Sequence, residues 1–382
     1  MEFTFATVPQ LFCAPGAVAR AAEFAQRRRL QRVLVVADPG VLKAGLLQPL
    51  LDALIAAKLD YALFTGVEPD PGEHVVTAAY TQARDFGAQM VVGLGGGSSL
   101  DVAKLAAYFA DSSETLRQIV GVEQTKGRRL PLVLIPTTAG TGSEVTPIAI
   151  VTLADQTKGG VVSSMLLPDL AILDPNLTLS LPPVVTAHTG VDAMVHAIEA
   201  FTSRHRKNVL SDALALRALK LLNDNIRTAF SDGRNAQARQ DMLLGACLAG
   251  MAFANSPVAA VHALAYPLGG IFHMPHGLSN AVILTEVLRF NRDAALAQYA
   301  ELGRALTMKS MSDDEAADFL FATLDALLVD LKIDTRLSSY GIRESDLDRL
   351  AEDALRQQRL LVNNPRDVTL ADARAIYARR LG

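Results

Sequence analysis

The pattern of apolar residues changes near residue 184, which divides the chain into two parts of different fold class. Before that point, short apolar runs rich in β-branched residues alternate with stretches whose apolar residues recur at helical spacing. We expect strands at residues 32–37, 61–64, 90–94 and 132–136, and helices at residues 41–59 and 72–86. Alternation of this kind indicates a largely parallel sheet covered by helices.

The second half of the chain has a different pattern. After Pro182 and Pro183 no segment resembles a strand, and apolar residues keep a helical period through 186–230, 237–253 and onward to the C-terminus. A chain of 382 residues is too long for one ordinary hydrophobic core. We therefore predict an α/β domain over residues 1–183 and an all-α domain over residues 184–382.

Composition excludes several classes of partner. The net charge is -4, and the short basic cluster Arg27–Arg29 is placed to end a helix, so we expect no nucleic-acid partner. No apolar run approaches the ~18 residues of a membrane helix, and Met1–Phe5 lack the features of a signal peptide. With only Cys13 and Cys247, no disulfide framework is implied, and we expect a cytoplasmic protein.

Two segments of the helical half combine into a metal site. Asp192 and His196 are four residues apart and project from one face of a helix, while His262 and His276 follow in later segments. One carboxylate and three imidazoles suit Fe(II) or Zn(II) and bind Mg²⁺ or Ca²⁺ poorly. Glu199, three residues after His196, is either an acceptor for an imidazole N–H or a surface acid.

A glycine-rich loop in the α/β half has two interpretations. Residues 95–101 directly follow an expected strand and precede an expected helix. There, glycine N–H groups and a helix N-terminus would bind a phosphate. Alternatively, the segment is a plain turn in which Ser98 caps the helix and Asp101 completes a capping box. It does not match the G-x-G-x-x-G dinucleotide fingerprint.

Polar residues also follow two neighbouring strands. The loop 137–144 lies at the end of an expected strand, where it is either part of a ligand crevice or an ordinary polar loop. Asp38 ends the first clear strand, where a carboxylate accepts hydrogen bonds from ribose hydroxyls and repels a 2′-phosphate, favouring NAD over NADP. The alternative for Asp38 is a surface residue that opens the turn at Pro39-Gly40.

Together these motifs resemble the iron-containing (group III) alcohol dehydrogenase family over essentially the whole chain. The matching segments are Gly95–Asp101, Pro136–Glu144, Leu167–Asp169 with Asp174-Pro175, Thr189–His196, His262, Pro275–Gly277 and Asn363–Arg366. The resemblance implies a Rossmann-like dinucleotide-binding α/β domain followed by a C-terminal α-helical metal-binding domain, the architecture of dehydroquinate synthase. It also implies a homodimer or a higher homo-oligomer.

The resemblance further implies the residues of the site. The metal ligands would be Asp192, His196, His262 and His276. NAD, or less favourably NADP, would bind in the cleft between the domains. The cofactor-binding residues would be Asp38, Gly96, Gly97, Ser98, Asp101, Thr137, Thr138 and Lys158. Lys158 is followed by Gly159, where family members often have two adjacent lysines.

The implied enzyme is a metal-dependent oxidoreductase. It would transfer a hydride between NAD(H) and a small primary alcohol, diol or aldehyde, with Fe(II), or Zn(II) as the second choice, polarising the substrate oxygen. The expected catalytic residues are His262, His276, Tyr266 and His273. Tyr266 stands where many members have histidine, and a phenol with a pKa of about 10 carries protons poorly. His273 either shuttles protons or is structural.

Three alternative functions remain open. A metal- and NAD-using synthase or lyase of the dehydroquinate synthase type needs a Lys/Arg set for an acidic, phosphorylated substrate, and none stands beside the ligands. A hydroxy-acid dehydrogenase needs an arginine to clamp a carboxylate, and none is obviously placed to do so. A non-enzymatic metal-binding protein would leave the two polar loops at residues 95–101 and 137–144 without purpose.

Overall fold

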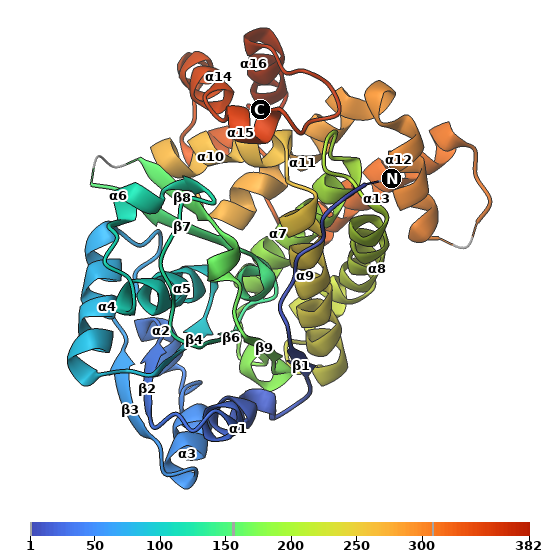
Figure 1. Ribbon diagram of the computed structural model, residues 1–382. Helices are drawn as coiled ribbons and strands as arrows, with labels where there is room; N and C mark the ends of the chain where they lie inside the picture. The colour runs from blue at the N-terminus through green and yellow to red at the C-terminus, as the bar shows by residue number, and fades with distance from the viewer. Residues whose placement is uncertain (1, 155–156, 308) are drawn as a thin grey trace. The chain divides into compact units, whose positions relative to one another are not determined.

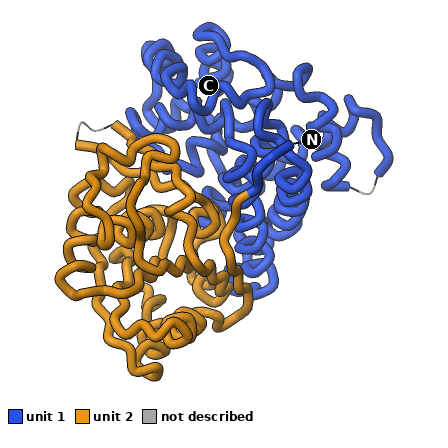
Figure 2. The backbone as a smooth tube through the Cα atoms, in the orientation of Figure 1, with its two compact units in different colours: residues 1–5, 182–382 blue, residues 6–181 orange. Residues whose placement is uncertain are grey.

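The computed structural model describes residues 2–154, 157–307 and 309–382, and its chain divides into two compact units (Figure 2). One unit contains residues 6–181, and the other contains residues 1–5 and 182–382. The division falls between Leu181 and Pro182, whereas the sequence placed it after residue 183 and assigned residues 1–5 to the first domain. The two predicted ranges remain our proposal for the functional domains.

The α/β unit is built on a six-stranded parallel sheet with the order β1-β9-β6-β4-β2-β3 (Figure 1). The four expected strands are confirmed as β2 (Arg32–Val36), β3 (Asp60–Phe64), β4 (Met90–Gly95) and β6 (Leu132–Pro136). The edge strand β1 (Leu11–Cys13) and its neighbour β9 (Leu170–Leu173) were not predicted. They have only three and four residues, which is too short for a periodic signal.

Helices cover both faces of this sheet. They are α1 (Arg20–Arg27), α2 (Pro39–Lys43), α3 (Gln48–Ala56), α4 (Glu73–Phe86), α5 (Gly97–Ala110) and the short α6 (Leu116–Ile119). The single helix predicted over residues 41–59 is wrong, because the chain breaks there into α2 and α3. Gly45 lies between them with a φ of 72°, a left-handed conformation that glycine adopts without steric cost.

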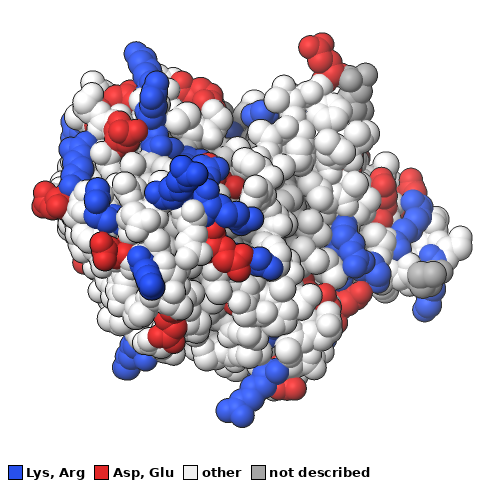
Figure 3. Space-filling view, turned by 60° about the horizontal axis from the view of Figure 1, so that its bottom comes forward, with Lys and Arg blue, Asp and Glu red and all other residues white. Residues whose placement is uncertain are grey.

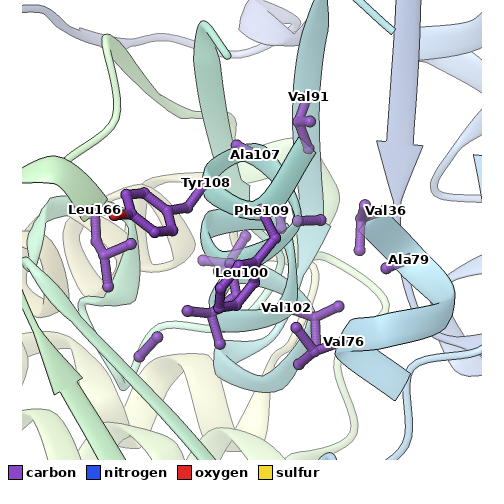
Figure 4. Packing of buried hydrophobic residues seen from close by; sticks show 14 of the residues in the cluster. Val36, Val76, Ala79, Val91, Leu100, Val102, Ala107, Tyr108, Phe109 and Leu166 are labelled. Carbon is purple, nitrogen blue, oxygen red and sulfur yellow. The ribbon is translucent and has the colours of Figure 1, made fainter. Parts of the chain in front are cut away.

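The alternation of side chains along β2 explains its continuously apolar sequence. Val33 and Val35 pack into a core with α1 and α3, while Leu34 and Val36 pack into the opposite core with α4 and α5. Figure 4 shows the second core, where Leu100 of α5 lies among the buried side chains. Because both faces are buried, every position of the strand is apolar.

A second, smaller sheet belongs to the same unit. Its order is β5-β8-β7, with β5 at Gly121–Val122, β7 at Ile148–Thr152 and β8 at Lys158–Val162. Strands β7 and β8 pair antiparallel. This sheet was not predicted, and it carries Lys158 as the first residue of β8.

The other unit is helical. Its helices are α7 (Pro183–Thr202), α8 (Val209–Ser231), α9 (Ala236–Asn255), α10 (Ala260–Phe272), α11 (His276–Asn291), α12 (Leu296–Ala305), α13 (Asp313–Asp330), α14 (Leu347–Leu355), α15 (Gln358–Leu361) and α16 (Leu370–Ala378). No strand follows Leu173 in the described part of the chain, so the predicted change of fold class is confirmed.

Two surface properties complete the description. Basic and acidic side chains are interspersed on the face shown in Figure 3. No single helix of the described residues has the length and apolar character to cross a membrane, and α9 and α10 pass that test only as a pair bent by 106°.

Candidate metal and dinucleotide sites

Three helices of the helical unit bring the four predicted metal ligands together. Asp192 and His196 lie on α7, His262 lies on α10, and His276 is the first residue of α11. One ligand atom from each of the four side chains lies within 4.8 Å of the others. The Nε2 atoms of the three histidines are 3.8, 3.8 and 3.6 Å from Oδ1 of Asp192. This geometry surrounds one point, as a single-ion site requires.

The cluster is buried on one side and open on the other. The exposed side-chain fractions are 3% for Asp192, 3% for His262 and 6% for His196, but 47% for His276. Burial alone would raise the pKa of Asp192. The charges of the three histidines and a hydrogen bond from Asn280 outweigh burial and lower that pKa below its ordinary value. Asp192 is therefore an ionised ligand, and the cluster is accessible from the side of His276.

A close helix contact positions His276. A Cβ atom on Gly277 would lie 2.3 Å from the backbone carbonyl oxygen of His188, which is part of α7. No side chain fits there, so only glycine lets the start of α11 lie this close to α7. That approach places His276 beside Asp192.

The imidazole of His262 is oriented by a buried acid. Glu199 Oε2 lies 2.6 Å from Nδ1 of His262, and Oε1 accepts a 2.6 Å hydrogen bond from the Val261 N–H. When Nδ1 carries the proton and donates a hydrogen bond to Glu199, Nε2 is unprotonated and its lone pair points to the centre of the cluster. The hypothesis that Glu199 accepts from an imidazole is thus confirmed, and the surface-acid alternative is wrong because Glu199 is buried.

Packing fixes the third imidazole. The His196 ring stacks on Phe253 at a centroid distance of 4.3 Å and on His262 at 4.8 Å. Stacking between two rings leaves His196 little rotational freedom. The orientation of this ligand is therefore set before any ion binds.

Asn280 is a site residue that the sequence interpretation missed. Its side-chain NH₂ donates a 2.6 Å hydrogen bond to Oδ1 of Asp192 and lies 3.3 Å from Nε2 of both His262 and His276. Its side chain is fully buried. The available signal was its spacing, because Asn280 follows His276 by one helical turn and so projects from the same face of α11.

Tyr266 lies where the helical spacing predicted. It is one turn after His262 on α10, and its ring centroid is 6.0 Å from that of His276. Burial raises the pKa of the Tyr266 phenol, and the negative charge of Asp192 raises it too. The positive charge of Arg359 opposes these effects, but the net result is a raised pKa. The phenol is therefore neutral at physiological pH.

His273 occupies the C-terminal end of α10. It adopts a left-handed conformation with a φ of 57°, and its backbone N–H donates to the Gly269 carbonyl, which ends the helix. Its imidazole is exposed and makes no hydrogen bond with the described residues. The geometry supports the structural interpretation of His273, and a proton-shuttle role stays a prediction.

In the α/β unit, all of the predicted cofactor residues except Lys158 follow three adjacent parallel strands. Val36 of β2 pairs with Gly93 of β4, and Gly95 of β4 pairs with Pro136 of β6. The chain runs from β2 to β3 on one side and then returns to place β4 on the other side. The carboxyl ends of β2 and β4 therefore flank a topological switch point, where open α/β sheets bind ligands.

The glycine loop leaves the first turn of α5 without a side-chain cap. Gly96 is the N-cap residue, so the predicted cap by Ser98 is wrong. Asp101 does not complete a capping box either. It accepts hydrogen bonds from the Ser143 hydroxyl at 2.6 Å and from the Ile150 N–H at 2.9 Å. With no side chain over them, the N–H groups of this turn are suited to a phosphate.

Asp38 caps a helix and lies next to the glycine loop, and its contact with a ribose stays a prediction. Its Oδ1 accepts from the Val41 N–H at 3.0 Å and caps α2, as the turn alternative required. Its Oδ2 accepts from the Ser99 hydroxyl at 3.0 Å, which brings Asp38 to the glycine loop. Thr137 joins the same loop through its N–H, which donates to the Gly95 carbonyl at 3.0 Å. The Thr138 side chain lies 3.8 Å from the position that a Cβ atom on Gly96 would occupy.

Lys158 is not brought to this loop by any hydrogen bond among the described residues. Its ammonium group contacts Asp70 at 2.7 Å and Thr152 at 3.1 Å. Asp70 and Thr152 also line an open pocket of about 1170 Å³ next to α4, whose lining includes none of the predicted cofactor residues. Gly159, which replaces the second lysine of the family pattern, lies in β8.

Lys104 is a second residue that the sequence interpretation missed. Its ammonium group is fully buried and donates to the Ser143 hydroxyl at 2.8 Å and to the Ile148 carbonyl at 2.6 Å. Burial lowers the pKa of Lys104, and the charge of Asp101 opposes that shift. Lys104 thus ties α5 to the loop 137–144 and to the start of β7. A lysine within the apolar run of α5 was the available signal.

Known proteins resemble the chain over its whole length. It is 41% identical to long-chain-alcohol dehydrogenase 1 of Geobacillus thermodenitrificans, covering 95% of this chain and 92% of the relative. It is 38% identical to sulfoacetaldehyde reductase of Bilophila wadsworthia, covering 96% of each chain. A solved 1,3-propanediol oxidoreductase superposes with a TM-score of 0.96 at 34% identity, covering 100% of each chain.

A further solved structure contains a cofactor. Sulfoacetaldehyde reductase from Bifidobacterium kashiwanohense, in complex with NAD+, superposes with a TM-score of 0.91 at 28% identity, covering 100% of this chain and 99% of the other.

Two family models match the two halves of the chain. The model described as iron-containing alcohol dehydrogenase matches residues 9–175, and the C-terminal model of the Fe-containing alcohol dehydrogenase family matches residues 186–381. The chain therefore belongs to the iron-containing alcohol dehydrogenase family and is an oxidoreductase of the alcohol dehydrogenase type.

Proposed function

We propose that this enzyme interconverts a small primary alcohol or diol and its aldehyde, using NAD and a divalent ion held by Asp192, His196, His262 and His276. Fe(II) is the proposed ion, with Zn(II) as the alternative, because both accept one carboxylate and three imidazoles. The proposal rests chiefly on the convergence of four ligand atoms within 4.8 Å in the helical unit. Family membership excludes a non-enzymatic protein and favours a dehydrogenase over a synthase.

The residues around the cluster prepare it for this ion. When bound, the ion supplies Lewis acidity that polarises a substrate oxygen, and NAD supplies or accepts the hydride. Glu199 holds the Nε2 lone pair of His262 toward the ion position, and Asn280 hydrogen-bonds the Asp192 carboxylate. Substrate enters on the side of the exposed His276, where Tyr266 offers a neutral hydroxyl. We propose His262 and His276 as catalytic through their hold on the ion.

NAD is proposed to bind at the switch point of the sheet. Backbone N–H groups of Gly96, Gly97 and Ser98 at the start of α5 would hold the pyrophosphate, since no side chain caps them. The Asp38 carboxylate would accept from the adenosine ribose and would repel the 2′-phosphate of NADP. The NAD+ complex of a similar protein supports this choice.

Four other predicted cofactor residues have different support. Thr137 and Thr138 lie beside the glycine loop and are proposed to contact the cofactor. Lys158 is held by Asp70, so its contact with the cofactor would require that ion pair to open. Asp101 is proposed to act indirectly, since its hydrogen bonds shape the loop.

We also propose a cytoplasmic homo-oligomer, a homodimer or larger. The chain has only two cysteines, Cys13 and Cys247, which supports a reducing compartment. Oligomerisation rests on the family resemblance. Sedimentation of the purified protein measures it directly.

Replacement of one ligand tests the proposed function. We expect His262→Ala to lose bound metal and turnover, because only three of the four ligands remain. The affinity for NAD should stay nearly unchanged. Metal content is measured by mass spectrometry, NAD binding by fluorescence titration, and turnover by NADH absorbance after stripped protein is resupplied with Fe(II) or Zn(II). His205→Ala, at an exposed position, is the matched control. Full activity of His262→Ala would contradict the metal assignment.

A further inference from the structure

Helix α5 carries a buried ammonium group, that of Lys104, which has no part in the chemistry proposed above. The Lys104 side chain is inaccessible to solvent, and Oδ1 of Asp101, one turn earlier on α5, lies 3.4 Å from its Nζ. Its Nζ donates hydrogen bonds to Ser143 Oγ at 2.8 Å, Thr146 Oγ1 at 3.3 Å and the Ile148 carbonyl at 2.6 Å. These five residues form the Lys104 cluster.

The directions of the hydrogen bonds in the Lys104 cluster require a charged lysine. The Ser143 hydroxyl donates its proton to Asp101 at 2.6 Å, so the Ser143 oxygen accepts from Lys104. The Thr146 hydroxyl donates to the Ser143 carbonyl at 3.4 Å and likewise accepts from Lys104. With the Ile148 carbonyl as a third acceptor, all three protons of an ammonium group are used. A buried charge that is fully hydrogen-bonded in this way holds its partners in fixed positions.

The Lys104 cluster joins α5 to the segment that lies beside the glycine loop. A Cβ atom on Gly97 would lie 2.9 Å from Cγ2 of Thr141, so Thr141 packs directly against the first residue of α5. The N–H of Thr137 donates to the Gly95 carbonyl at 3.0 Å. The segment 137–144 therefore follows the glycine loop, and Ser143 fastens its far end to Lys104 further along the helix.

The same cluster joins α5 to the smaller sheet. Asp101 accepts a 2.9 Å hydrogen bond from the Ile150 N–H, and Lys104 donates to the Ile148 carbonyl, so both residues of α5 bind β7. Strand β7 pairs with β8, whose first residue is Lys158. Two side chains on one face of α5 thus set the position of the segment 137–144 and of the strand pair that carries Lys158.

We propose that Lys104 is a positioning residue for the cofactor, whose buried charge holds the segment 137–144 and β7 against α5 and thereby sets the affinity for NAD. The inference rests on the proposed function, because it takes the start of α5 as the NAD site. Lys104 acts through the segment and not by contact, since its side chain is inaccessible even without a ligand. It takes no part in hydride or proton transfer.

Binding of NADH to the metal-loaded protein, without substrate, tests the inference. Lys104→Met keeps the length of the side chain but removes its charge and its three donors. We expect the dissociation constant of NADH, measured by fluorescence titration, to rise roughly 10- to 100-fold in this variant, the usual loss for hydrogen bonds that involve a charged group. Because Lys104→Met leaves Asp101 without its cation, thermal unfolding is measured beside it to establish that the variant is folded.

A milder variant keeps the test decisive if Lys104→Met does not fold. Ser143→Ala removes one member of the Lys104 cluster and leaves the pair of Lys104 and Asp101 in place. We expect the dissociation constant of NADH to rise about 3- to 10-fold in Ser143→Ala, as for the loss of one neutral hydrogen-bonding group. The double variant should bind NADH no more weakly than Lys104→Met, because both changes break the same cluster.

Arg129→Met is the matched control, because Arg129 is a cation that joins elements at the opposite edge of the same sheet. It precedes β6, and it pairs at 2.5 Å with Asp169, which precedes β9. Arg129→Met should lower the melting temperature, as Lys104→Met does, but should bind NADH as wild type does. This control separates a positioning role from a general loss of stability.

The outcomes for the two hypotheses differ. Equal dissociation constants in wild type, Lys104→Met and Ser143→Ala would overturn the inference, and so would an equal loss of NADH binding in Arg129→Met. NADH binding and metal-dependent turnover by wild type would still uphold the proposed function in that case. A wild-type protein that bound no NADH would overturn the proposed NAD site itself.

Discussion

At the scale of single residues, Glu199 links two parts of the metal cluster. It lies on α7 with Asp192 and His196, and its two oxygens bind Nδ1 of His262 and the N–H of Val261 on α10. One buried carboxylate therefore sets both the ring orientation of a ligand and the position of the helix that carries it. Residues that hydrogen-bond to a metal ligand usually influence the affinity for the metal strongly.

We predict that Glu199→Gln weakens metal binding. A glutamine side chain has one acceptor oxygen, so either Val261 or His262 loses its partner. We expect the affinity for Zn(II) to fall about 10- to 100-fold, measured by competition with a chelator. Glu301→Gln, at an exposed site on α12, is the matched control and should bind as wild type does. Equal affinities for Glu199→Gln and wild type would refute the orienting role.

At the scale of elements, α10 is held by the C-terminal helix α16 as well as by α7. The Tyr377 hydroxyl of α16 donates a 2.6 Å hydrogen bond to the Leu264 carbonyl, between His262 and Tyr266. Tyr377 is fully buried. Burial raises the pKa of its phenol well above the ordinary value of 10.0, and the charge of Asp353 raises it further.

This pKa shift predicts a loss of stability in alkaline solution. Below pH 10 both the folded and the unfolded phenol are protonated, so the contribution is fully present. As the pH rises above 10, the unfolded phenol ionises while the folded one does not, and the free energy of unfolding falls by up to about 1.4 kcal/mol per pH unit. Urea titrations at pH 8, 10 and 11 should show a steeper decline for wild type than for Tyr377→Phe. Parallel declines would contradict the assignment.

At the scale of the whole molecule, the two ligand sites belong to different units. The metal ligands lie within residues 192–276, and the predicted NAD residues lie within residues 38–158. Each ligand should therefore stabilise its own unit first. An ion that binds only the folded state adds about 2.7 kcal/mol at a free concentration of 100 times its Kd.

Calorimetry tests this division. We expect Zn(II) to raise the melting temperature of the helical unit and NAD that of the α/β unit, with a chelator reversing only the first shift. His262→Ala should lose the response to Zn(II) and keep the response to NAD. If Zn(II) stabilised His262→Ala as strongly as wild type, the stabilising ion would be bound elsewhere.

The errors made from the sequence have local causes that the tertiary structure reveals. The capping box at Ser98, the alternative interpretation of the glycine loop, is wrong because Asp101 binds Ser143 and Ile150 of β7. The continuous helix over residues 41–59 is wrong because one glycine adopts a left-handed conformation. In both cases the apolar period was correct and a single polar or glycine position decided the outcome.

Features that depend on neighbours within a turn or a strand could be predicted from the amino-acid sequence. Apolar periodicity is local, so it revealed β2, β4 and β6, and the four-residue spacing placed Asp192 and His196 on one face of α7. Contacts between distant residues could not be predicted, because they form only in the folded protein. Glu199 reaches His262 across 63 residues and Asn280 reaches Asp192 across 88. Such pairings arise from helix packing, because the energy of a contact does not depend on sequence separation.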